Sequence, residues 1–584
     1  MNDTLDVILV NRCNQNDDFR TVLSVKMCVR VLPILMLAAA AVLVVGTGVG
    51  AAATTWYVDD GGGADYDTIQ GAVDVAGTGD TIYVYDGIYD ENVVISTSIT
   101  LSGQSESNVT INGGGSGDCV QISSSDVVMN GFTITNASRY GLYAYSSDVN
   151  IENVTITGNG AYGIYFQSGK GFTLRDSTID GNGGGITYHG YATGDAVVED
   201  NTITNNLGHG MAIALTEGKS ATVRNNTIDN NAGGSSDGIN VNIAGTGGVM
   251  AIENNPVTKS GRYGICLTGV RTGSTIANFA VQGSGNVGLY TISSDVNIEN
   301  VTITGNGAYG IYFQSGKGFT LRDSTIDGNG GGIYYHSYAS GDAVVEDNAI
   351  TNNVGFGALI YLTEGRSATV RNNRIDNNAG SSSDGISVHI AGSGGVSTIK
   401  NNRVENSGRY GIYLTGATNS AVAGNDIIRN SYGMYLHSSS DNLIFHNNFL
   451  DNANYNAKDD GTSNSWDDGY PSAGNYWSDH GGADDFKGPD QDQSGKDGII
   501  DTPYPIPGGS SVDRYPLMHP WTGDTPQKGD LNGDNQITPA DAAIALHLAA
   551  TGTHDDAADV SGDGDVTSLD ALMILQAAAG RIAL

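Results

Sequence analysis

A short repeat limits the folds open to this chain more than any other feature of its sequence. The segment 146–186, SSDVNIENVTITGNGAYGIYFQSGKGFTLRDSTIDGNGGGI, recurs without change at 293–333. Within each block, apolar residues of one phase return roughly every 23 residues, with a longer step where a loop is inserted. These anchors are Ile134, Ile156, Ile179, Ile203, Ile228, Val257, Val281, Ile303, Ile326, Ile350, Ile375, Val404, Ile427 and Phe449.

The repeat predicts a solenoid. Short alternating strands such as VTIT and GIYF, separated by Gly and Asn turns, indicate that each period forms one coil of a parallel β-helix. Leucine-rich repeats have a similar period, but their leucine pattern is missing here, and a propeller blade needs roughly 40 residues. We therefore expect an all-β, single-stranded parallel β-helix over residues 106–452, with duplicated blocks at 141–268 and 288–415.

Most Asn and Asp residues of the repeat have a structural explanation. They stand three positions before the apolar anchors, as at Asn153, Asp176, Asp200 and Asn225. Stacked coils lie ~4.8 Å apart, so such side chains can form a hydrogen-bonded ladder along a turn.

Cys119 and Cys266 also follow the repeat, six coils apart. At ~4.8 Å per coil they are too distant for a disulfide. We expect both to be reduced and to point inward.

Residues 1–53 have the features of a leader and signal peptide. Lys26 and Arg30 precede an apolar stretch, 31–45, and small residues follow up to Ala53. This stretch is short for a membrane span, so we expect cleavage near Ala53, a mature chain without a membrane span, and a secreted or cell-surface location. A retained anchor is the alternative.

The remaining segments differ in character from the repeat. Residues 54–105, with a short amphipathic helix expected within 67–95, are predicted to cap the start of the solenoid and to supply its first strands. The irregular, aromatic segment 453–519 is predicted to cap its end. A linker, 520–528, then leads to a separate C-terminal module, 529–584.

Two stretches carry a resemblance to known families. The opening WYVDDGGGADYDTIQGAVDVAGTGDTIYV (56–84) resembles the start of pectin-lyase-like right-handed β-helix proteins. The segment from NLIFHNNFLDN to SVDRYPLM (442–518) resembles the NosD-type β-helix family. The resemblance implies right-handed coils and a surface protein of the carbohydrate-binding and sugar-hydrolase group. NosD proteins proper are linked to copper delivery.

The C-terminal module contains two matched acidic loops, DLNGDNQITPAD (530–541) and DVSGDGDVTSLD (559–570). Alternating oxygen donors closed by a carboxylate at position 12 suit calcium, which takes 6–8 oxygen ligands. We predict two calcium ions, held by Asp530, Asn532, Asp534, Gln536 and Asp541 in the first loop and by Asp559, Ser561, Asp563, Asp565 and Asp570 in the second.

Each loop leads into an Ala/Leu-rich helix, so the module resembles a type I dockerin. The resemblance implies docking to a cohesin-bearing scaffold or surface protein. It also implies that loop positions 10 and 11 contact the partner, here Pro539 and Ala540 in one half and Ser568 and Leu569 in the other. Because these pairs differ, equivalent docking through either half is not expected.

A further calcium ion is conceivable in DQDQSGKDGIID (490–501), which contains Asp490, Asp492, Asp497 and Asp501. A solvated acidic turn is the alternative.

The stretch NLGHGMAI (206–213) resembles the Gly-His-Gly motif near the catalytic centre of polygalacturonases. The aspartates of that family precede the motif, whereas Asp237 follows His209 here, and the duplicate of His209 is Phe356. We therefore predict no catalytic role for His209.

No other constellation identifies a reaction. Carboxylates ~5–10 Å apart would permit glycoside hydrolysis, and candidate members are Glu199 with Asp200, Asp176 with Asp180, and Glu217 with residues of the neighbouring coils. Copper needs soft or imidazole ligands, but His189, His336, His437, His446 and His480 form no tight cluster in the sequence. We name no catalytic residue.

A binding face is easier to support than an active site. Tyrosines recur in the strands, and exposed rings could stack on sugars. The alternative is that they fill the interior of the solenoid or shield its faces. The residues are Tyr140, Tyr162, Tyr165, Tyr263, Tyr290, Tyr309, Tyr312, Tyr410 and Tyr413.

The formal charge of −36 argues against nucleic acid as a partner. Three functions stay open. The first is a polysaccharide-binding protein docked through calcium and cohesin. The second is a polysaccharide lyase or glycoside hydrolase in polysaccharide catabolism, and the third is a structural or adhesive surface protein.

Overall fold

The computed structural model describes residues 52–584 apart from short gaps. The positions outside the described residues are 1–51, 146–147, 193, 217, 246–247, 337–339, 393, 523–527, 532–536, 552, 554, 556, 562–564 and 583. The expected leader and its apolar stretch therefore fall almost wholly outside the described part of the chain.

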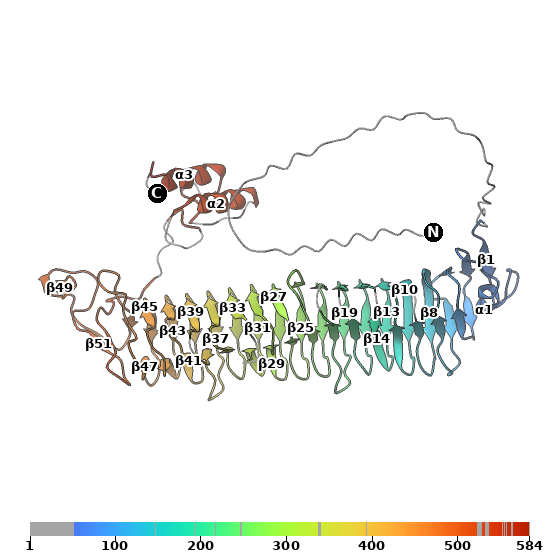
Figure 1. Cartoon of the computed structure of the whole chain (residues 1–584), viewed down its shortest axis with the longest axis horizontal. Coiled ribbons are helices and arrows are strands. Elements are labelled where there is room, and N and C mark those ends of the chain that lie inside the picture. The colour runs from blue at the N-terminus through green and yellow to red at the C-terminus, as the bar shows by residue number, and fades with distance from the viewer. Residues whose placement is uncertain are drawn as a thin grey trace, which may run out of the picture. The chain divides into compact units, whose positions relative to one another are not determined.

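Parallel coils stack along most of the described chain, as predicted from the repeat (Figure 1). One coil and the start of the next consist of β10 (Asp148–Thr157), β11 (Tyr162–Gln167), β12 (Gly171–Arg175) and β13 (Thr178–Asp180). The first half of β10 pairs with β12, Val149 opposite Phe172, and its second half pairs with β13, Ile156 opposite Ile179. Each coil therefore contributes strands to three faces.

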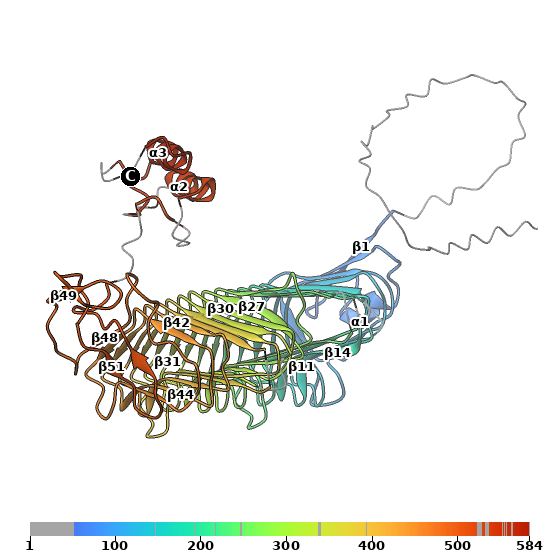
Figure 2. The same ribbon diagram turned by 60° about the vertical axis from the view of Figure 1, so that its left-hand side comes forward.

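The faces belong to two large parallel sheets. The first sheet has 32 strands and forms two faces, because long strands such as β10 continue from one face to the next. Its members include β27 (Asp295–Glu299), β30 (Gly318–Arg322) and β42 (Ala421–Ala423), which lie along the same face in Figure 2.

The second sheet has 16 strands and forms what we call the third face. Its strands, in spatial and chain order, are β4 (Val93–Ile95), β7 (Val120–Ile122), β9 (Leu142–Tyr145), β11, β14 (Gly184–Ala192), β17 (Met211–Leu215), β20 (Ile239–Ile243), β23 (Ile265–Thr268), β26 (Leu289–Ile292), β29 (Tyr309–Phe313), β32 (Gly331–Tyr335), β35 (Ala358–Leu362), β38 (Ile386–Ile390), β41 (Tyr410–Thr415), β44 (Tyr432–His437) and β47 (Ala457–Asp459).

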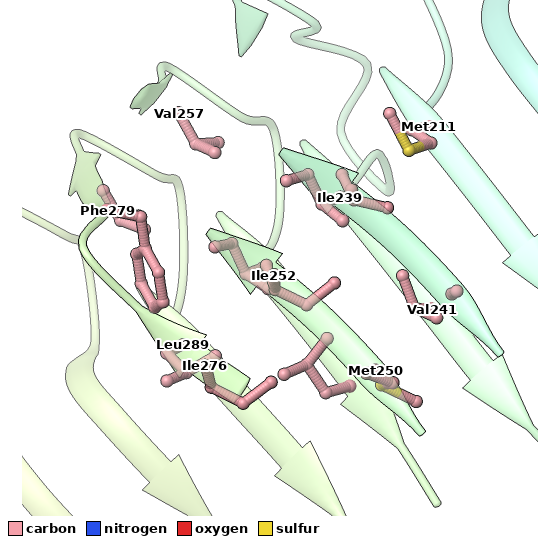
Figure 3. Packing of buried hydrophobic residues seen from close by; sticks show 14 of the residues in the cluster. Met211, Ile239, Val241, Met250, Ile252, Val257, Ile276, Phe279 and Leu289 are labelled. Atoms are coloured by element: carbon pink, nitrogen blue, oxygen red, sulfur yellow. The ribbon is translucent and has the colours of Figure 1, made fainter. Parts of the chain in front are cut away.

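Apolar side chains fill the interior because alternate strand residues point inward. Figure 3 shows Ile239 and Val241 of β20 facing Ile252 of the opposite sheet, and all three are fully buried. Burial of one such side chain stabilises the fold by ~1.5–3 kcal/mol. The in-register pairing repeats this contact in coil after coil, so the core runs the length of the stack.

The predicted polar ladder lies on the outside of a turn. The Asn225 amide donates a hydrogen bond to Asp200 at 3.0 Å, and the Asn254 amide donates one to Asn225 at 3.2 Å. The three residues adopt left-handed backbone conformations with φ between 56° and 60°. Asn and Asp tolerate this region better than other residues that carry a side chain.

A second ladder, which the sequence alone does not separate from the first, is buried one residue later. Asn201 Nδ2 donates to Asn226 Oδ1 at 2.9 Å, and Asn226 Nδ2 donates to Asn255 Oδ1 at 3.0 Å. The same Asn226 amide also donates to the carbonyl of Val198 at 2.8 Å. Because unpaired buried amides are costly, this ladder explains why Asn so often follows Asn or Asp in the repeat.

The two cysteines of the solenoid are both free, as predicted. Cys119 lies in the interior, but the expectation that Cys266 also points inward is wrong. Cys266 pairs in register with Asn240 and Tyr290, whose side chains are on the outside, and its neighbours cover it. The six coils between the cysteines contain inserted loops. Two residues that lie a whole number of average repeats apart in the sequence therefore need not point to the same side of their strands.

Both ends of the solenoid are covered. Helix α1 (Ile69–Val73) packs on β1 (Thr55–Val58), β2 (Thr81–Val84) and β4 (Figure 1). The Glu91 carboxylate accepts the free N–H groups of Ile69 and Gln70 at 2.8 and 2.9 Å, which fixes the first turn of α1. At the other end, Trp466 and Trp477 are buried with Phe449, whose ring stacks on Trp477 at 4.4 Å.

Among its described residues, the C-terminal module has two helices, α2 (Pro539–Thr551) and α3 (Ser568–Ala578), which pack through Ala545 and Ile574. Within the described residues, no helix is both long and apolar enough to cross a membrane.

Candidate functional site

Tyrosines gather on the outer surface of the third face, which we call the tyrosine face. In each coil these tyrosines occupy either one outward strand position, which stays in register from coil to coil, or the position three residues before it. They are Tyr140, Tyr143, Tyr162, Tyr165, Tyr263, Tyr290, Tyr309, Tyr312, Tyr334, Tyr410, Tyr413, Tyr432, Tyr435 and Tyr455. The nine predicted tyrosines are all among them and are half-buried, so they do not fill the interior. Tyr188 and Tyr335, by contrast, point inward and are fully buried.

The rings stack from coil to coil. The Tyr140 and Tyr165 centroids are 4.7 Å apart with planes at 8°, and those of Tyr312 and Tyr334 are 5.0 Å apart at 10°. This spacing follows from the ~4.8 Å between paired strands. The result is two aromatic tracts, one over β9 and β11 and a longer one from Tyr263 to Tyr455. In the longer tract, Tyr361 and His389 connect the rings across β35 and β38, where Leu359 and Ser387 occupy the tyrosine position.

Five members of the face, Tyr143, Tyr334, Tyr432, Tyr435 and Tyr455, are not among the tyrosines predicted from the sequence. Each lies one coil period from another member, so that period could have identified them.

A recurring Asp–Arg–Tyr unit fixes three of the tyrosines. Arg262 donates from Nε and Nη2 to the buried Asp237 carboxylate at 2.8 and 2.7 Å, and its guanidinium lies 4.5 Å from the centroid of the Tyr263 ring. Equivalent units are Asp118–Arg139–Tyr140 and Asp384–Arg409–Tyr410. Bidentate pairing is the strong geometry for Arg and carboxylate, so each unit holds its tyrosine rigidly.

The aromatic tracts are interrupted over β17 and β20, where Ala212 and Asn240 occupy the tyrosine position. His209 lies in this gap, and its Nδ1 accepts the backbone N–H of Asp237 at 2.9 Å. Its duplicate Phe356 stacks on Tyr309 at 5.6 Å. The structure thus places His209 in a turn contact beside the Asp237–Arg262 pair.

At the far end of the tyrosine face, three polar groups converge. The Tyr435 hydroxyl donates to Asp460 Oδ2 at 2.6 Å, and His437 Nδ1 lies 3.1 Å from that hydroxyl and 3.0 Å from the same carboxylate oxygen. Lys458 Nζ lies 4.7 Å from the Tyr435 ring centroid. In the sequence, His437 is only a candidate for copper binding.

The electrostatics of this cluster are well defined. Partial desolvation opposes ionisation of Asp460, but hydrogen bonds from Tyr435, the Ser438 N–H and His437 hold its pKa at about 2. Desolvation, followed by the hydrogen bond to Asp460, raises the pKa of Tyr435 above its ordinary value. The cluster therefore combines an ionised carboxylate, a protonated phenol and an imidazole.

The candidate carboxylate pairs have structural partners. Glu199 binds Arg175 at 3.0 Å and lies 3.3 Å from Arg224. Asp180 accepts hydrogen bonds from Thr204 and Asn205. Asp176 and Asp200 occupy left-handed turn positions, and Glu217 is outside the described residues.

The histidines do not gather into a copper site in the part of the chain that the structure describes. Across these positions, no group of three or more His, Cys, Asp or Glu residues is placed to hold a metal ion.

The acidic loop of the C-terminal cap uses its carboxylates to bind backbone. Asp501 accepts the N–H groups of Asp485 and Phe486, and Asp497 accepts those of Gly488 and Ile499. These contacts fix the loop through its own backbone, and the further calcium ion stays a prediction. Asp490 and Asp492 are on the surface of the same loop.

The two acidic loops of the C-terminal module close in the same way. Asp541 accepts the N–H groups of Leu531 and Thr538 at 2.9 and 2.8 Å. Asp570 accepts those of Ser561 and Thr567 at the same distances.

The other predicted calcium ligands divide into two sets. Asp530 and Asp559 are buried at the first loop positions, Ser561 is half-buried, and Asp565 is exposed. Asn532, Asp534, Gln536 and Asp563 are outside the described residues. The carboxylate and hydroxyl oxygens that are described fit a hard cation such as calcium.

The four predicted partner contacts are all exposed at the starts of the helices: Pro539 and Ala540 on α2, and Ser568 and Leu569 on α3. Leu572 and Leu575 continue the apolar surface of α3 at 49% and 45% exposure. The matched positions of α2 are Ala543 and Leu546. The two halves therefore present unequal surfaces.

Family models match three parts of the chain. "Right handed beta helix region" matches residues 97–242 and 237–388, which together span half of the chain. "Periplasmic copper-binding protein (NosD)" matches 338–482, and "Dockerin type I domain" matches 528–577. These matches confirm the predicted right-handed β-helix, its NosD-like part and the dockerin.

Solved structures that match the chain include the A-module of mannuronan C-5 epimerase AlgE6 from Azotobacter vinelandii, at 14% identity, 68% coverage of this chain and 94% of that chain, with a TM-score of 0.23. The Dettilon tailspike protein matches at 16% identity, with 62% of each chain covered and a TM-score of 0.27. Alginate lyase from Paenibacillus sp. FPU-7 matches at 13% identity, with 60% and 94% coverage and a TM-score of 0.16.

No curated protein sequence matches the chain significantly. The residues matched by the β-helix and NosD models nevertheless form coils in the structure, and both acidic loops lie within the residues matched by the dockerin model. The chain belongs to the right-handed parallel β-helix proteins and carries a C-terminal type I dockerin domain.

Proposed function

We propose that this protein binds polysaccharide along the tyrosine face and docks to a cohesin-bearing partner through its dockerin, in a calcium-dependent manner outside the cytoplasm. The observation that carries the proposal is the in-register stack of half-buried tyrosines. Tyrosine offers an apolar ring for the C–H face of a sugar and a hydroxyl for its polar edge.

Uncharged polar side chains flank the rings and suit sugar hydroxyls. Gln167 accepts the Tyr143 hydroxyl at 3.0 Å, and Gln314 accepts that of Tyr290. In the gap between the tracts, Asn240 and Asn242 of β20 point outward. A long face of this kind fits an extended polymer better than a single small sugar.

The docking half of the proposal rests on the dockerin match and on the two acidic loops. Two calcium ions would be held by the ten predicted ligands and would keep the loops closed. We further propose that α3 is the principal contact helix, because Leu569, Leu572 and Leu575 are exposed together on it. On α2 the matched residues are Ala540, Ala543 and Leu546, a smaller apolar surface.

A retention experiment tests polysaccharide binding. The full chain is electrophoresed through native gels that contain single polysaccharides, and its mobility is compared with that in a plain gel. Retardation by at least one polymer, lost in the Tyr312→Ala/Tyr334→Ala variant but kept in Tyr57→Ala, supports the proposal. Tyr57 is a matched control because its ring is exposed in a cluster with Tyr83 and Tyr85, off the tyrosine face. If no polymer retards the chain, a structural or adhesive role replaces the proposal.

A second candidate function is a polysaccharide lyase or glycoside hydrolase, which the Tyr435–His437–Asp460 cluster favours. General acid–base catalysis needs a proton donor and a proton acceptor that both lie within hydrogen-bond reach of the bound substrate. Tyr435 stays protonated, and the ionised Asp460 orients it and the His437 ring. In this role Tyr435 would donate a proton and His437 would accept one.

Product release separates this candidate from simple binding. Any polymer that retards the chain is incubated with it, and reducing and unsaturated ends are assayed over time. Product that is abolished in both His437→Ala and Tyr435→Phe establishes an enzyme. Retention without product leaves the binding function alone.

A further inference from the structure

The charged side chains of the tyrosine face balance one another. From β7 to β47, the described part of this face carries four carboxylates, those of Asp118, Asp237, Asp384 and Asp460, and four cationic groups, those of Arg139, Arg262, Arg409 and Lys458. The whole chain has a formal charge of −36. A neutral surface on so acidic a chain is a local property of this face.

Each of the three arginines is engaged on one donor edge. Each directs Nε and Nη2 to one Asp carboxylate at 2.7–3.0 Å. Bidentate recognition of a sugar carboxylate or sulfate by Arg uses this same fork of donors. The Asp carboxylate already neutralises the charge of each arginine, so an acidic polymer at the remaining Nη1–Nη2 edge would bring its charge close to that of the protein carboxylate.

The flat sides of the arginines are engaged as well. The guanidinium of Arg139 lies 4.9 Å from the Tyr140 centroid, and that of Arg409 lies 4.8 Å from the Tyr410 centroid. The fourth cation, Lys458, lies over the Tyr435 ring. The cations thus serve to position tyrosines.

The field of the whole chain also opposes a polyanion. Like charge lowers the local concentration and the association rate of a charged ligand, whereas a neutral ligand is unaffected. Stacking and hydrogen bonding from uncharged groups are what this face offers, through its tyrosines and through Gln167, Asn242 and Gln314.

We infer that the tyrosine face takes a neutral polysaccharide and not a polyanion, an inference that rests on the proposed function. The structural basis is the pairing of every described cation of the face with a carboxylate or a tyrosine ring. A uronate-containing or sulfated polymer lacks a counter-charge here.

The test compares neutral and acidic polymers at two ionic strengths. The full chain is run through native gels that contain a neutral polymer (xylan, mannan or mixed-linkage glucan) and through gels that contain an acidic one (alginate or polygalacturonate). Binding is then measured in solution in low salt and in ~1 M NaCl, where the Debye length falls to about 3 Å. We expect retention by a neutral polymer, with less than a twofold change in Kd on adding salt. Retention by an acidic polymer that is lost in salt overturns the inference but leaves polysaccharide binding intact. Retention by neither class overturns both.

A variant that frees one arginine supplies an internal control. Asp118 belongs to the pair that is most exposed on its Arg side, at 56%, so Asp118→Asn disturbs the fold least. We expect this variant to gain salt-sensitive retention by polygalacturonate, because its Arg139 no longer has a carboxylate partner. If the parent chain already shows that salt-sensitive retention, the pairing does not exclude polyanions and the inference fails.

Discussion

The carboxylate of Asp237 and the guanidinium of Arg262 form a bidentate pair, with Nε–Oδ1 at 2.8 Å and Nη2–Oδ2 at 2.7 Å. The pair links one coil to the next, and it recurs as Asp118–Arg139 and Asp384–Arg409. In each case the arginine carries a tyrosine of the outer face. The same Asp–Arg pair thus joins two adjacent coils and positions a tyrosine ring on the candidate binding surface.

Arg262→Ala should destabilise the β-helix, because it leaves the fully buried Asp237 carboxylate without its principal partner. The expected loss in the free energy of unfolding is ~1–3 kcal/mol, measured by urea denaturation followed by tryptophan fluorescence. Arg374→Ala is the matched control, since Arg374 is 53% exposed and pairs with Asp376 on the surface, where such pairs contribute ~0–1 kcal/mol. Equal losses in the two variants would contradict the structural role of the buried pair.

Tyr312→Ala combined with Tyr334→Ala should weaken polysaccharide binding at least tenfold. The two rings stack 5.0 Å apart on adjacent coils, so removing both opens a gap in the longer aromatic tract. Two lost ring contacts of ~1 kcal/mol each exceed the ~1.4 kcal/mol that corresponds to a tenfold change in Kd. Isothermal titration with the polymer identified by gel retention measures the change, and Tyr57→Ala should leave Kd unaltered.

The fold followed from the sequence because a parallel β-helix is a periodic object. The anchors Ile156 and Ile179 are one coil apart in the sequence and lie opposite each other in adjacent strands, as the repeat requires. The acidic loops were equally readable, since fixed ligand spacing encodes the site within a short stretch. Both features are local in the chain or strictly periodic along it.

The candidate site was harder to see, because it depends on which residues share an outward register. Tyr435, His437 and Asp460 come from one strand and the turn of the next coil, and no short motif marks them. For Cys266 the sequence suggested too much. Its separation of six repeats from Cys119 predicted that both side chains point inward, but the inserted loops shift the register and Cys266 points outward. Phase within a coil must be counted strand by strand.

Asp513 should make the stability of the C-terminal cap depend on pH. Burial raises the pKa of its carboxyl to about 7, against the hydrogen bonds that it accepts from Asn475, Trp477 and Tyr515. A folded-state pKa above the unfolded value of ~3.9 means that the native state binds the proton more tightly. The contribution is therefore complete below pH ~4 and is lost as the pH rises through about 7.

Thermal melting of the parent chain and of Asp513→Asn, from pH 5 to pH 8, measures this dependence. The parent should lose melting temperature across the range, and the variant should have a flatter profile whatever its overall stability. A parent profile as flat as that of the variant would show that Asp513 does not titrate in this range.

Calcium removal should unfold the dockerin while leaving the β-helix intact. The loop carboxylates at positions 1 and 12, Asp530 with Asp541 and Asp559 with Asp570, are all buried, and without a cation they repel one another. A ligand that binds only the folded state stabilises it by ~2.7 kcal/mol at one hundred times its Kd. We expect a calcium-dependent melting transition in helical circular dichroism and an unchanged β transition. Identical helical melting in calcium and in chelator would be inconsistent with a calcium-bound module.

Leu572→Asp should abolish capture by a cohesin, whereas Ala543→Asp should leave it largely intact. Leu572 is 49% exposed on α3, between the exposed Leu569 and Leu575, and Ala543 is its counterpart on α2. Both substitutions place the same charge on an exposed helix position, so neither should affect folding, which calcium-dependent helicity checks. A pulldown with immobilised cohesin domains in calcium measures capture. If both variants lose it equally, the two helices contribute alike. If only Ala543→Asp loses it, α2 is the contact helix, and the unequal apolar surfaces of the two halves do not decide how the dockerin binds.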